Sequence, residues 1–264
     1  MTISLVPDTP LMPDTPRVRE TFDATLQALV HPGWAAAFPW VLQGTTTRGA
    51  PAREIDFGLF SDGSPAALVQ RNWGRLLALT AMPTAVHARQ VHEAEVRFHA
   101  EVGAGLRLVE ACDGHATDRA GALLAVSTAD CVPIFVVDPE AEVVAVLHAG
   151  WRGVAAGVLE RGLAVLAERA GSMSADVHVH LGPAICEACY EVGPEVFEAL
   201  GQPVPKSPRP LDLRGALGAR AVASGVDPTK LTTSTHCTRC TGSGLFSHRG
   251  GDRCRQIGYL GIRP

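Results

Sequence analysis

Two histidines and one cysteine, His92, Cys131 and His148, are the residues of this chain whose types best suit a metal ion. Imidazole and thiolate groups bind zinc and copper, and a set of three protein ligands leaves one coordination position for water or substrate. The spacings of 39 and 17 residues match no short metal-binding motif, so two hydrogen-bonded histidines and a buried thiol fit them as well. In a third interpretation His148 activates Cys131 as a nucleophile, which leaves His92 without a role. We favour the metal site because it uses all three residues.

The sequence between two of these residues predicts how they meet. Apolar runs suited to buried strands occupy residues 122–127, 134–137 and 143–147, and the sequence DPEAE at 138–142 favours a turn. The last two runs therefore predict an antiparallel hairpin, in which we expect Val137 to pair with Val143. Val132 then faces His148, and Cys131 lies beside it at the open end of the hairpin.

The third candidate ligand lies on another expected strand, which includes Val86 and Ala88. Because side chains alternate with a period of two, Gln90 and His92 would share one face of that strand.

The sequence HAGWRG at 148–153 leads into a helix expected over residues 154–170. Its glycines permit a tight turn, and Arg152 together with the first amides of the helix would attract a phosphate or carboxylate. An ordinary strand-to-helix turn with an exposed arginine is the alternative, since the glycines match no standard phosphate-binding loop.

Two CxxC pairs, Cys186/Cys189 and Cys237/Cys240, are halves of a possible zinc site. However, 47 residues separate the pairs, which is longer than the usual spacing. A four-cysteine zinc site and a redox or disulfide role are therefore both less favoured than buried or incidental thiols. We expect His178 and His180 on a solvent-facing side of a strand over 178–185, and the sequence suggests no partner for His31, His87, His99 or His115.

The rest of the 264 residues predicts one domain. A proline-rich tail at 1–18, with PDTP twice, precedes a single domain over 19–264; we also expect a surface loop at 203–210 and a helix within 210–226. The net charge of −4 argues against nucleic-acid binding, and the chain has neither an apolar run of membrane-spanning length nor a secretory signal. Seven cysteines without an export signal favour reduced thiols and a cytoplasmic protein.

Four segments together resemble one known family: RQVH (89–92), STADCVPIFVVD (127–138), HAGWRG (148–153) and GPAICEACYEVGPEV (182–196). The chain is similar to the YfiH-type family over about residues 43–257. That family is also called the multicopper polyphenol oxidase (laccase) domain family, the purine nucleoside phosphorylase-like proteins, or peptidoglycan editing factor.

The resemblance implies a single α/β domain layered α/β/β/α, with zinc, or alternatively copper, held by His92, Cys131 and His148 as the catalytic centre. Carried over by motif, it also implies substrate-binding residues: Arg48, Asn72, Gln90, Arg152, His236 and Arg249. The C-terminal segment that holds His236, Ser247 and Arg249 resembles the family's cysteine-rich run and F-S-x-R motif. The sequence RGGD at 249–252 replaces the usual R-R-D, and RCR at 253–255 replaces T-G-R, so one expected phosphate contact is in doubt.

The implied activity is metal-dependent phosphorolysis of a purine nucleoside (adenosine, inosine or methylthioadenosine) to the free base and ribose 1-phosphate, with deamination of adenosine as a second reaction. Its partners are then a small nucleoside and phosphate, with no nucleic acid and no membrane, in a monomer or homodimer. Copper-dependent oxidation of phenols is less favoured, because the ten histidines are scattered instead of paired. Editing of peptidoglycan precursors, or a binding role, remains a third hypothesis.

Overall fold

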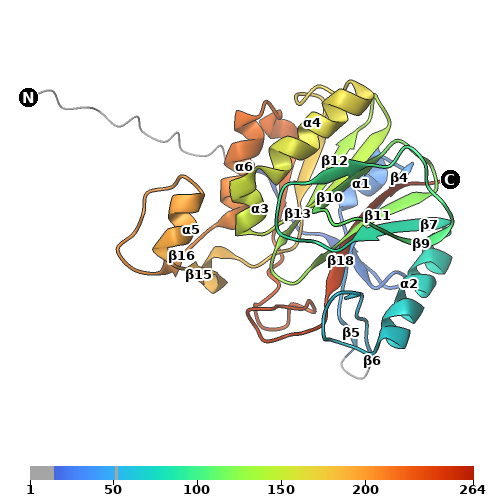
Figure 1. Ribbon diagram of the computed structural model, residues 1–264, viewed down its shortest axis with the longest axis horizontal. Helices are drawn as coiled ribbons and strands as arrows, with labels where there is room; N and C mark the ends of the chain where they lie inside the picture. The colour runs from blue at the N-terminus through green and yellow to red at the C-terminus, as the bar shows by residue number, and fades with distance from the viewer. Residues whose placement is uncertain (1–14, 51–52) are drawn as a thin grey trace, which may run out of the picture.

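The computed structural model describes residues 15–50 and 53–264. Two seven-stranded sheets pack face to face, and helices cover their outer faces (Figure 1). Most of the proline-rich tail expected at 1–18 lies outside the described residues. Its end is not a tail: strand β1 (Arg17–Val18) pairs in parallel with β17 (Leu231–Ser234), so that part of the prediction is wrong.

The first sheet contains, in spatial order, β1, β17, β14 (His178–Leu181), β12 (Val132–Asp138), β13 (Val143–Ala149), β10 (Gly114–Thr117) and β8 (Val96–Phe98). The second contains β2 (Thr21–Asp23), β3 (Ala28–Val30), β4 (Val41–Thr46), β18 (Gln256–Ile262), β11 (Ala122–Thr128), β7 (Thr84–Ala88) and β9 (Gly105–Val109). Two short ribbons stand apart: β5 (Gly49–Ala50) with β6 (Arg53–Glu54), and β15 (Glu191–Val192) with β16 (Arg209–Pro210).

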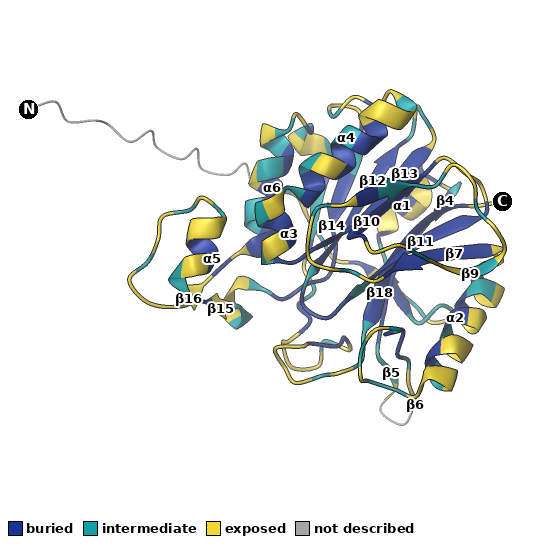
Figure 2. Ribbon diagram, in the orientation of Figure 1, coloured by how far each residue is buried: buried dark blue, intermediate teal, exposed yellow. Residues whose placement is uncertain are grey.

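Six α-helices and two 3₁₀ turns complete the described residues. They are α1 (Pro32–Ala37), α2 (Ala66–Thr80), α3 (Trp151–Ala156), α4 (Val158–Ala170), α5 (Pro194–Ala199) and α6 (Leu213–Ala223), with η1 (Glu187–Cys189) and η2 (Pro228–Lys230). Their dark inner faces and yellow outer faces in Figure 2 show that each helix of the outer layers buries one side only. In α2 the buried side chains include Val69, Trp73 and Leu76, at the spacing of one helical face.

Alternating apolar side chains of the strands build three cores, which explains the layered order. In β12, Ile134 and Val136 pack with α4 and α6 on one face, whereas Phe135 and Val137 turn to the second sheet. The third core joins α2 to the outer face of the second sheet, where Trp73 is fully buried. This is the α/β/β/α sandwich that the sequence resemblance predicted.

The expected hairpin is present, one residue out of register. Val137 pairs with Val144 instead of Val143, and His148 therefore faces Pro133. The physical reason lies in the turn: Asp138 belongs to β12, and its carboxylate accepts the backbone N–H groups of Glu140 and Ala141. Cys131 still lies next to the open end of the hairpin, one residue before β12.

Other predicted elements change at their ends. The helix expected over 154–170 begins at Trp151 and is divided at Gly157, which has a φ of 86° and separates α3 from α4. The strand expected over 178–185 ends at Leu181, and the helix expected within 210–226 is α6. The expected surface loop at 203–210 is mostly exposed, but its last two residues form β16.

The last strand of the chain occupies the middle of the second sheet (Figure 1). Strand β18 pairs antiparallel with β4 on one side and with β11 on the other, and all seven of its residues are buried. It therefore lies between β2, β3 and β4 on one side and β11, β7 and β9 on the other. The loops after β7 and β11 carry the candidate ligands His92 and Cys131.

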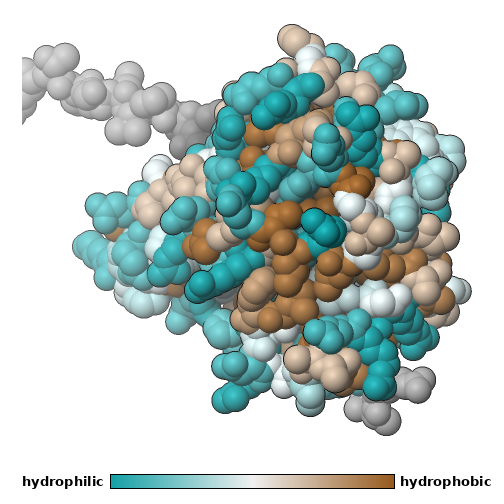
Figure 3. All heavy atoms as spheres, turned by 45° about the vertical axis from the view of Figure 1, so that its right-hand side comes forward, coloured by the Kyte–Doolittle hydropathy of each residue, from teal (hydrophilic) through white to brown (hydrophobic). Residues whose placement is uncertain are grey.

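The surface is mixed. Figure 3 shows hydrophobic residues gathered in a band across the middle of one face, with hydrophilic residues around it. Apolar atoms make up much of the surface of ordinary folded proteins, so the band assigns no partner, and the choice between monomer and homodimer remains a prediction. Within the described residues, no helix is long and apolar enough to cross a membrane.

Candidate metal centre

The three candidate ligands meet at one point. The ligand atoms of His92, Cys131 and His148 all lie within 4.8 Å of one another, and the two imidazole rings are almost perpendicular with centroids 4.9 Å apart. His148 comes from β13 and Cys131 from the loop before β12, as the hairpin predicted. His92 comes from the loop after β7, because that strand ends at Ala88 and does not include Gln90 or His92 as expected.

A buried carboxylate that the sequence analysis did not single out organises this loop. Oδ1 of Asp113 lies 2.9 Å from Nδ1 of His148, and the same carboxylate accepts backbone N–H groups of Val91, His92 and Glu93 at 3.0–3.1 Å. The Nδ1–H of His148 must donate, so its Nε2 is left for a ligand. Carboxylate–imidazole pairs of this kind orient histidines that bind metals.

Close approach of backbone and side chains fits a small bound ion. A Cβ atom on Gly150 would lie 3.0 Å from Sγ of Cys131 and 3.2 Å from Cδ2 of His92, so a glycine keeps the space between them open. Two loop residues also have the left-handed backbone that is unusual outside glycine: φ is 63° at His92 and 95° at Asp130. Such conformations persist where the surrounding structure holds them, often at functional sites.

The electrostatics of the cluster favour a thiolate. Burial opposes ionisation of Cys131, but the charge of His148 and hydrogen bonds from His148 and His92 outweigh burial and lower the pKa of the thiol to about 6. Burial alone would lower the pKa of His148, whereas Cys131 and Asp113 raise it to about 9. A thiolate with two neighbouring imidazoles is a donor set that suits zinc, and also copper.

The cluster opens into a cavity of about 640 Å³, within the size range of small-molecule sites. Besides the three ligands, the lining includes Gln90 and His87. The other lining residues are Gly58, Phe60, Ser61, Asp62, Ser127, Ala129, His248, Asp252, Arg253 and Arg255. The cavity is therefore built from five separate parts of the chain, and its positive and aromatic groups come mainly from the segments around 58–62 and 248–255.

Gln90 lines this cavity but uses its amide elsewhere. Its Nε2 donates to the carbonyl of Ser127 at 2.8 Å, and its Oε1 accepts the N–H of the same residue at 2.7 Å. His87 donates from Nδ1 to the carbonyl of Ala125 at 3.0 Å. Both side chains thus fasten the end of β11 and present their remaining surface to the cavity.

The other residues expected to bind substrate lie around or away from the cavity. Arg48 forms an ion pair of 2.6 Å with Asp252, a lining residue. Arg249 donates from its backbone to Asp130 at 2.7 Å, and its guanidinium lies over the ring of Tyr190. Both are therefore neighbours of the cavity and are not part of its lining.

Three further residues that were expected to bind substrate do not line the cavity. Asn72 donates to the backbone carbonyl of Asp56 at 2.8 Å beside α2. The guanidinium of Arg152 lies over the ring of Trp151, 4.2 Å from its centroid, in the first turn of α3, and the expected anion cradle stays a prediction. His236 follows the end of β17, and its Nε2 lies 3.8 Å from the carboxylate of Glu20.

Sequence reasoning missed two groups at this site. Arg253 and Arg255 line the cavity, whereas the sequence analysis treated RCR at 253–255 only as a departure from the family pattern. Phe60 also lines it, with its ring 5.9 Å from that of His87. The three arginines at 249, 253 and 255 were a signal for the first group, whereas no sequence pattern indicated Phe60.

Several histidine expectations are wrong. His180 is fully buried, not solvent-facing, and Nε2 lies 3.0 Å from the carboxylate of Glu20. His31 caps α1 and accepts the N–H of Trp34. His99 and His115 lie with ring nitrogens 3.0 Å apart, so the histidines without an evident partner in the sequence have one in the fold.

Fold and site together define a two-sheet α/β protein with a three-ligand metal-type centre at the mouth of a cavity. The family model described as multi-copper polyphenol oxidoreductase laccase matches residues 43–263. The chain belongs to this family.

Relatives and solved structures agree with this assignment. The purine nucleoside phosphorylase YlmD of Geobacillus stearothermophilus is 33% identical, over 88% of this chain and 95% of the relative. A protein of an unknown prokaryotic organism, named adenosine deaminase RL5, is 37% identical over 64% of this chain and 68% of its own length. The crystal structure of YlmD from Geobacillus stearothermophilus superposes with a TM-score of 0.83 at 29% identity, covering 94% of this chain and 100% of the other.

Proposed function

We propose that the chain is a metal-dependent enzyme that phosphorolyses purine nucleosides, namely adenosine, inosine or methylthioadenosine, and also deaminates adenosine. The observation that carries the proposal is the set of two histidines and one cysteine opening into a cavity of about 640 Å³. Relatives named purine nucleoside phosphorylase and adenosine deaminase support the same chemistry. Zinc is the proposed metal, with copper as the alternative.

In phosphorolysis, a phosphate oxygen forms a bond to C1′ of the ribose while the bond from C1′ to the purine nitrogen breaks. The electron pair stays on the purine, which takes up a proton, and ribose 1-phosphate is the second product. Catalysis of such a step depends on holding phosphate and nucleoside in line and on stabilising the developing charges.

The chain offers groups for each of these tasks. Arg253 and Arg255 line the cavity with positive charge that suits phosphate, and His248 lies on the same loop. Arg253 stands where relatives were expected to have threonine, so it replaces the phosphate contact that the missing second arginine put in doubt. Phe60 offers an aromatic face to a purine base.

The metal ligands have a separate task. His92, Cys131 and His148 would hold the ion, and Asp113 would keep the imidazole of His148 in the tautomer that binds it. A bound zinc ion would supply Lewis-acid chemistry, which polarises a substrate oxygen or lowers the pKa of the water whose oxygen replaces the amino group at C6 of adenine, with ammonia as the leaving group.

The test is direct. The zinc-loaded protein is incubated with inosine and phosphate, and hypoxanthine and ribose 1-phosphate are measured; adenosine without phosphate then tests deamination through the appearance of inosine. We expect turnover that requires Cys131 and falls in Arg253→Ala. No turnover of any purine nucleoside, or phenol oxidation by the copper-loaded protein in its place, would contradict the proposal.

A further inference from the structure

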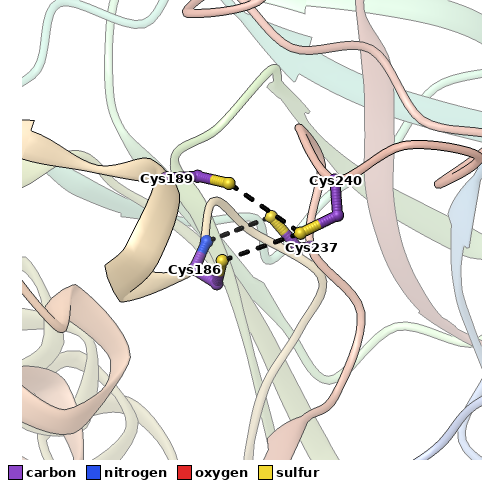
Figure 4. A group of neighbouring side chains, drawn as sticks. All are labelled: Cys186, Cys189, Cys237 and Cys240. Carbon is purple, nitrogen blue, oxygen red and sulfur yellow. Dashed lines mark hydrogen bonds between the residues drawn. The ribbon is translucent and has the colours of Figure 1, made fainter.

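Four cysteine sulfurs form a second cluster outside the cavity. Figure 4 shows the side chains of Cys186, Cys189, Cys237 and Cys240 turned toward one another. All four sulfurs lie within 4.8 Å of each other, and Sγ of Cys240 is 3.9 Å from that of Cys186 and 3.8 Å from that of Cys189. The thiols that the sequence favours as buried or incidental therefore share one location in the fold.

The topology explains this meeting of two distant pairs. Strands β14 and β17 are parallel neighbours in the first sheet, so the segments that follow them leave the sheet at the same end. Each segment carries one CxxC pair, and a bridge between Ala184 and Cys237 continues the pairing beyond the strands.

The distances between the sulfurs match a tetrahedral metal site. Four thiolates at about 2.3 Å from zinc are separated from one another by roughly 3.8 Å. A disulfide would bring two sulfurs to about 2.05 Å, and all four of these cysteines are free. We propose that Cys186, Cys189, Cys237 and Cys240 bind a structural zinc ion.

Backbone groups already support thiolates in this cluster. The N–H groups of Cys186 and Arg239 point at Sγ of Cys237, at 3.3 and 3.4 Å. The buried guanidinium of Arg214 donates to the carbonyls of Ser234 and His236 just before the second pair, which places a positive charge near a site of four negative sulfurs.

The zinc ion would tie together two loops that both hold Asp130, the residue before the cavity ligand Cys131. The N–H of Ile185 donates to the carbonyl of Asp130 at 3.0 Å, and the hydroxyl of Thr238 donates to its carboxylate at 2.5 Å. Since Asp130 has a φ of 95°, it needs such external support. A zinc ion bound by the four cysteines would thus hold the loop that carries Cys131 in place.

Metal analysis decides the proposal without an activity assay. The zinc content of protein purified in the presence of zinc is measured by elemental mass spectrometry, and we expect about two zinc ions per chain. The double variant Cys131→Ala/His92→Ala, which leaves the four-cysteine cluster intact, should retain about one. X-ray absorption of that remaining zinc should show four sulfur neighbours at about 2.3 Å.

Variants on the other side complete the test. Cys237→Ser/Cys240→Ser should hold about one zinc per chain, bound by nitrogen and sulfur in the cavity, and should melt at a lower temperature. Cys254→Ser is the matched control, because Cys254 is a free, partly buried cysteine outside both clusters, and it should keep about two.

Zinc absent from the cavity double variant, or bound there by nitrogen and oxygen, would overturn the inference. Two disulfides among the four cysteines in freshly purified protein would do the same. These outcomes do not depend on nucleoside turnover, so they separate this inference from the proposed function.

Discussion

The two cysteine-containing clusters of this protein differ in what surrounds them. The cavity cluster combines one thiol with two imidazoles and is held by a buried carboxylate, Asp113. The loop cluster contains four thiols and is held by backbone N–H groups. A site of three ligands keeps a position for substrate, whereas four sulfurs close the coordination shell. From this difference we expect the cavity cluster to take part in a reaction and the loop cluster to stabilise the fold.

The strongest way to break the comparison is Cys131→Ala. Removal of the only sulfur of the cavity cluster should lower nucleoside phosphorolysis by more than about 100-fold, since even outer-shell changes at metal sites cost about 10–100-fold. The melting temperature should change little, because Cys131 is only partly buried. Turnover and thermal unfolding measure the two effects, and unchanged turnover would remove the cavity cluster from the mechanism.

Asp113→Asn tests the outer support of the same cluster. The two carboxylate oxygens of Asp113 share three backbone N–H groups and the Nδ1–H of His148, whereas an amide has one acceptor oxygen and no charge, so the variant loses both an acceptor and the charge that orients His148. We expect a loss of about 10–100-fold in zinc affinity of the cavity site. Zinc titration measures the loss. Asp118→Asn, which changes an exposed ion pair with Arg119, is the control and should leave the affinity unchanged.

Gly150→Ala tests the close packing at the cavity ligands. The added Cβ would lie 3.0 Å from Sγ of Cys131, so the thiol must shift by a few tenths of an ångström. A shift of that size should reduce turnover by about 10-fold. Gly74→Ala is the control, since a Cβ there meets nothing within 4 Å, and it should preserve turnover and stabilise α2 by about 1 kcal/mol. Equal kinetics for the two variants would show that the packing at Gly150 is unimportant.

Glu20→Gln tests the buried hydrogen bonds to β14 and β17, the two strands that precede the loop cluster. Glu20 is buried and accepts hydrogen bonds from His180 and Ser234; burial raises the pKa of its carboxyl, but these partners lower the pKa overall to below its ordinary value of 4.5. The unfolded chain therefore takes up a proton first as the pH falls, so this contribution to stability is present above about pH 4.5 and is lost as the pH falls through the folded-state pKa. We expect the free energy of unfolding of the variant to be lower by about 1–3 kcal/mol at pH 7, and to fall less steeply than that of the wild type as the pH is lowered.

Urea unfolding at several pH values measures this effect. Glu168→Gln is the control, because it changes only an exposed ion pair with Arg161 and should leave the stability unchanged. A steeper acid limb in Glu20→Gln would contradict the assignment.

The layered fold was predictable, whereas its registers were not. Continuous apolar runs locate β11, β12 and β13 to within a few residues, because both faces of each sheet are covered. The hairpin slipped by one residue since the carboxylate of Asp138 caps the turn from within the strand. The break at Gly157 depends on its left-handed backbone, which a lone glycine in a helical pattern does not reveal.

At the candidate site, the clustering of the three side chains was predictable, whereas the residues that support them were not. Chemistry and hairpin geometry indicated His92, Cys131 and His148, but Asp113 reaches them through the fold, 35 residues away from His148. The two CxxC pairs meet because β14 and β17 are parallel neighbours, and sequence separation carries no trace of that pairing. Local patterns thus identify donor atoms, while topology decides which of them share a centre.

The position of β18 has a consequence for the order in which the molecule can be completed. Residues 256–262 leave the ribosome after both strands that they pair with, β4 and β11, yet they join the two halves of the second sheet. Until then, β4 and β11 each expose an unpaired edge, and the loops that carry His92 and Cys131 follow strands of an incomplete sheet. Loss of residues 256–262 would therefore damage the whole sandwich, even though every proposed metal ligand would remain in the chain.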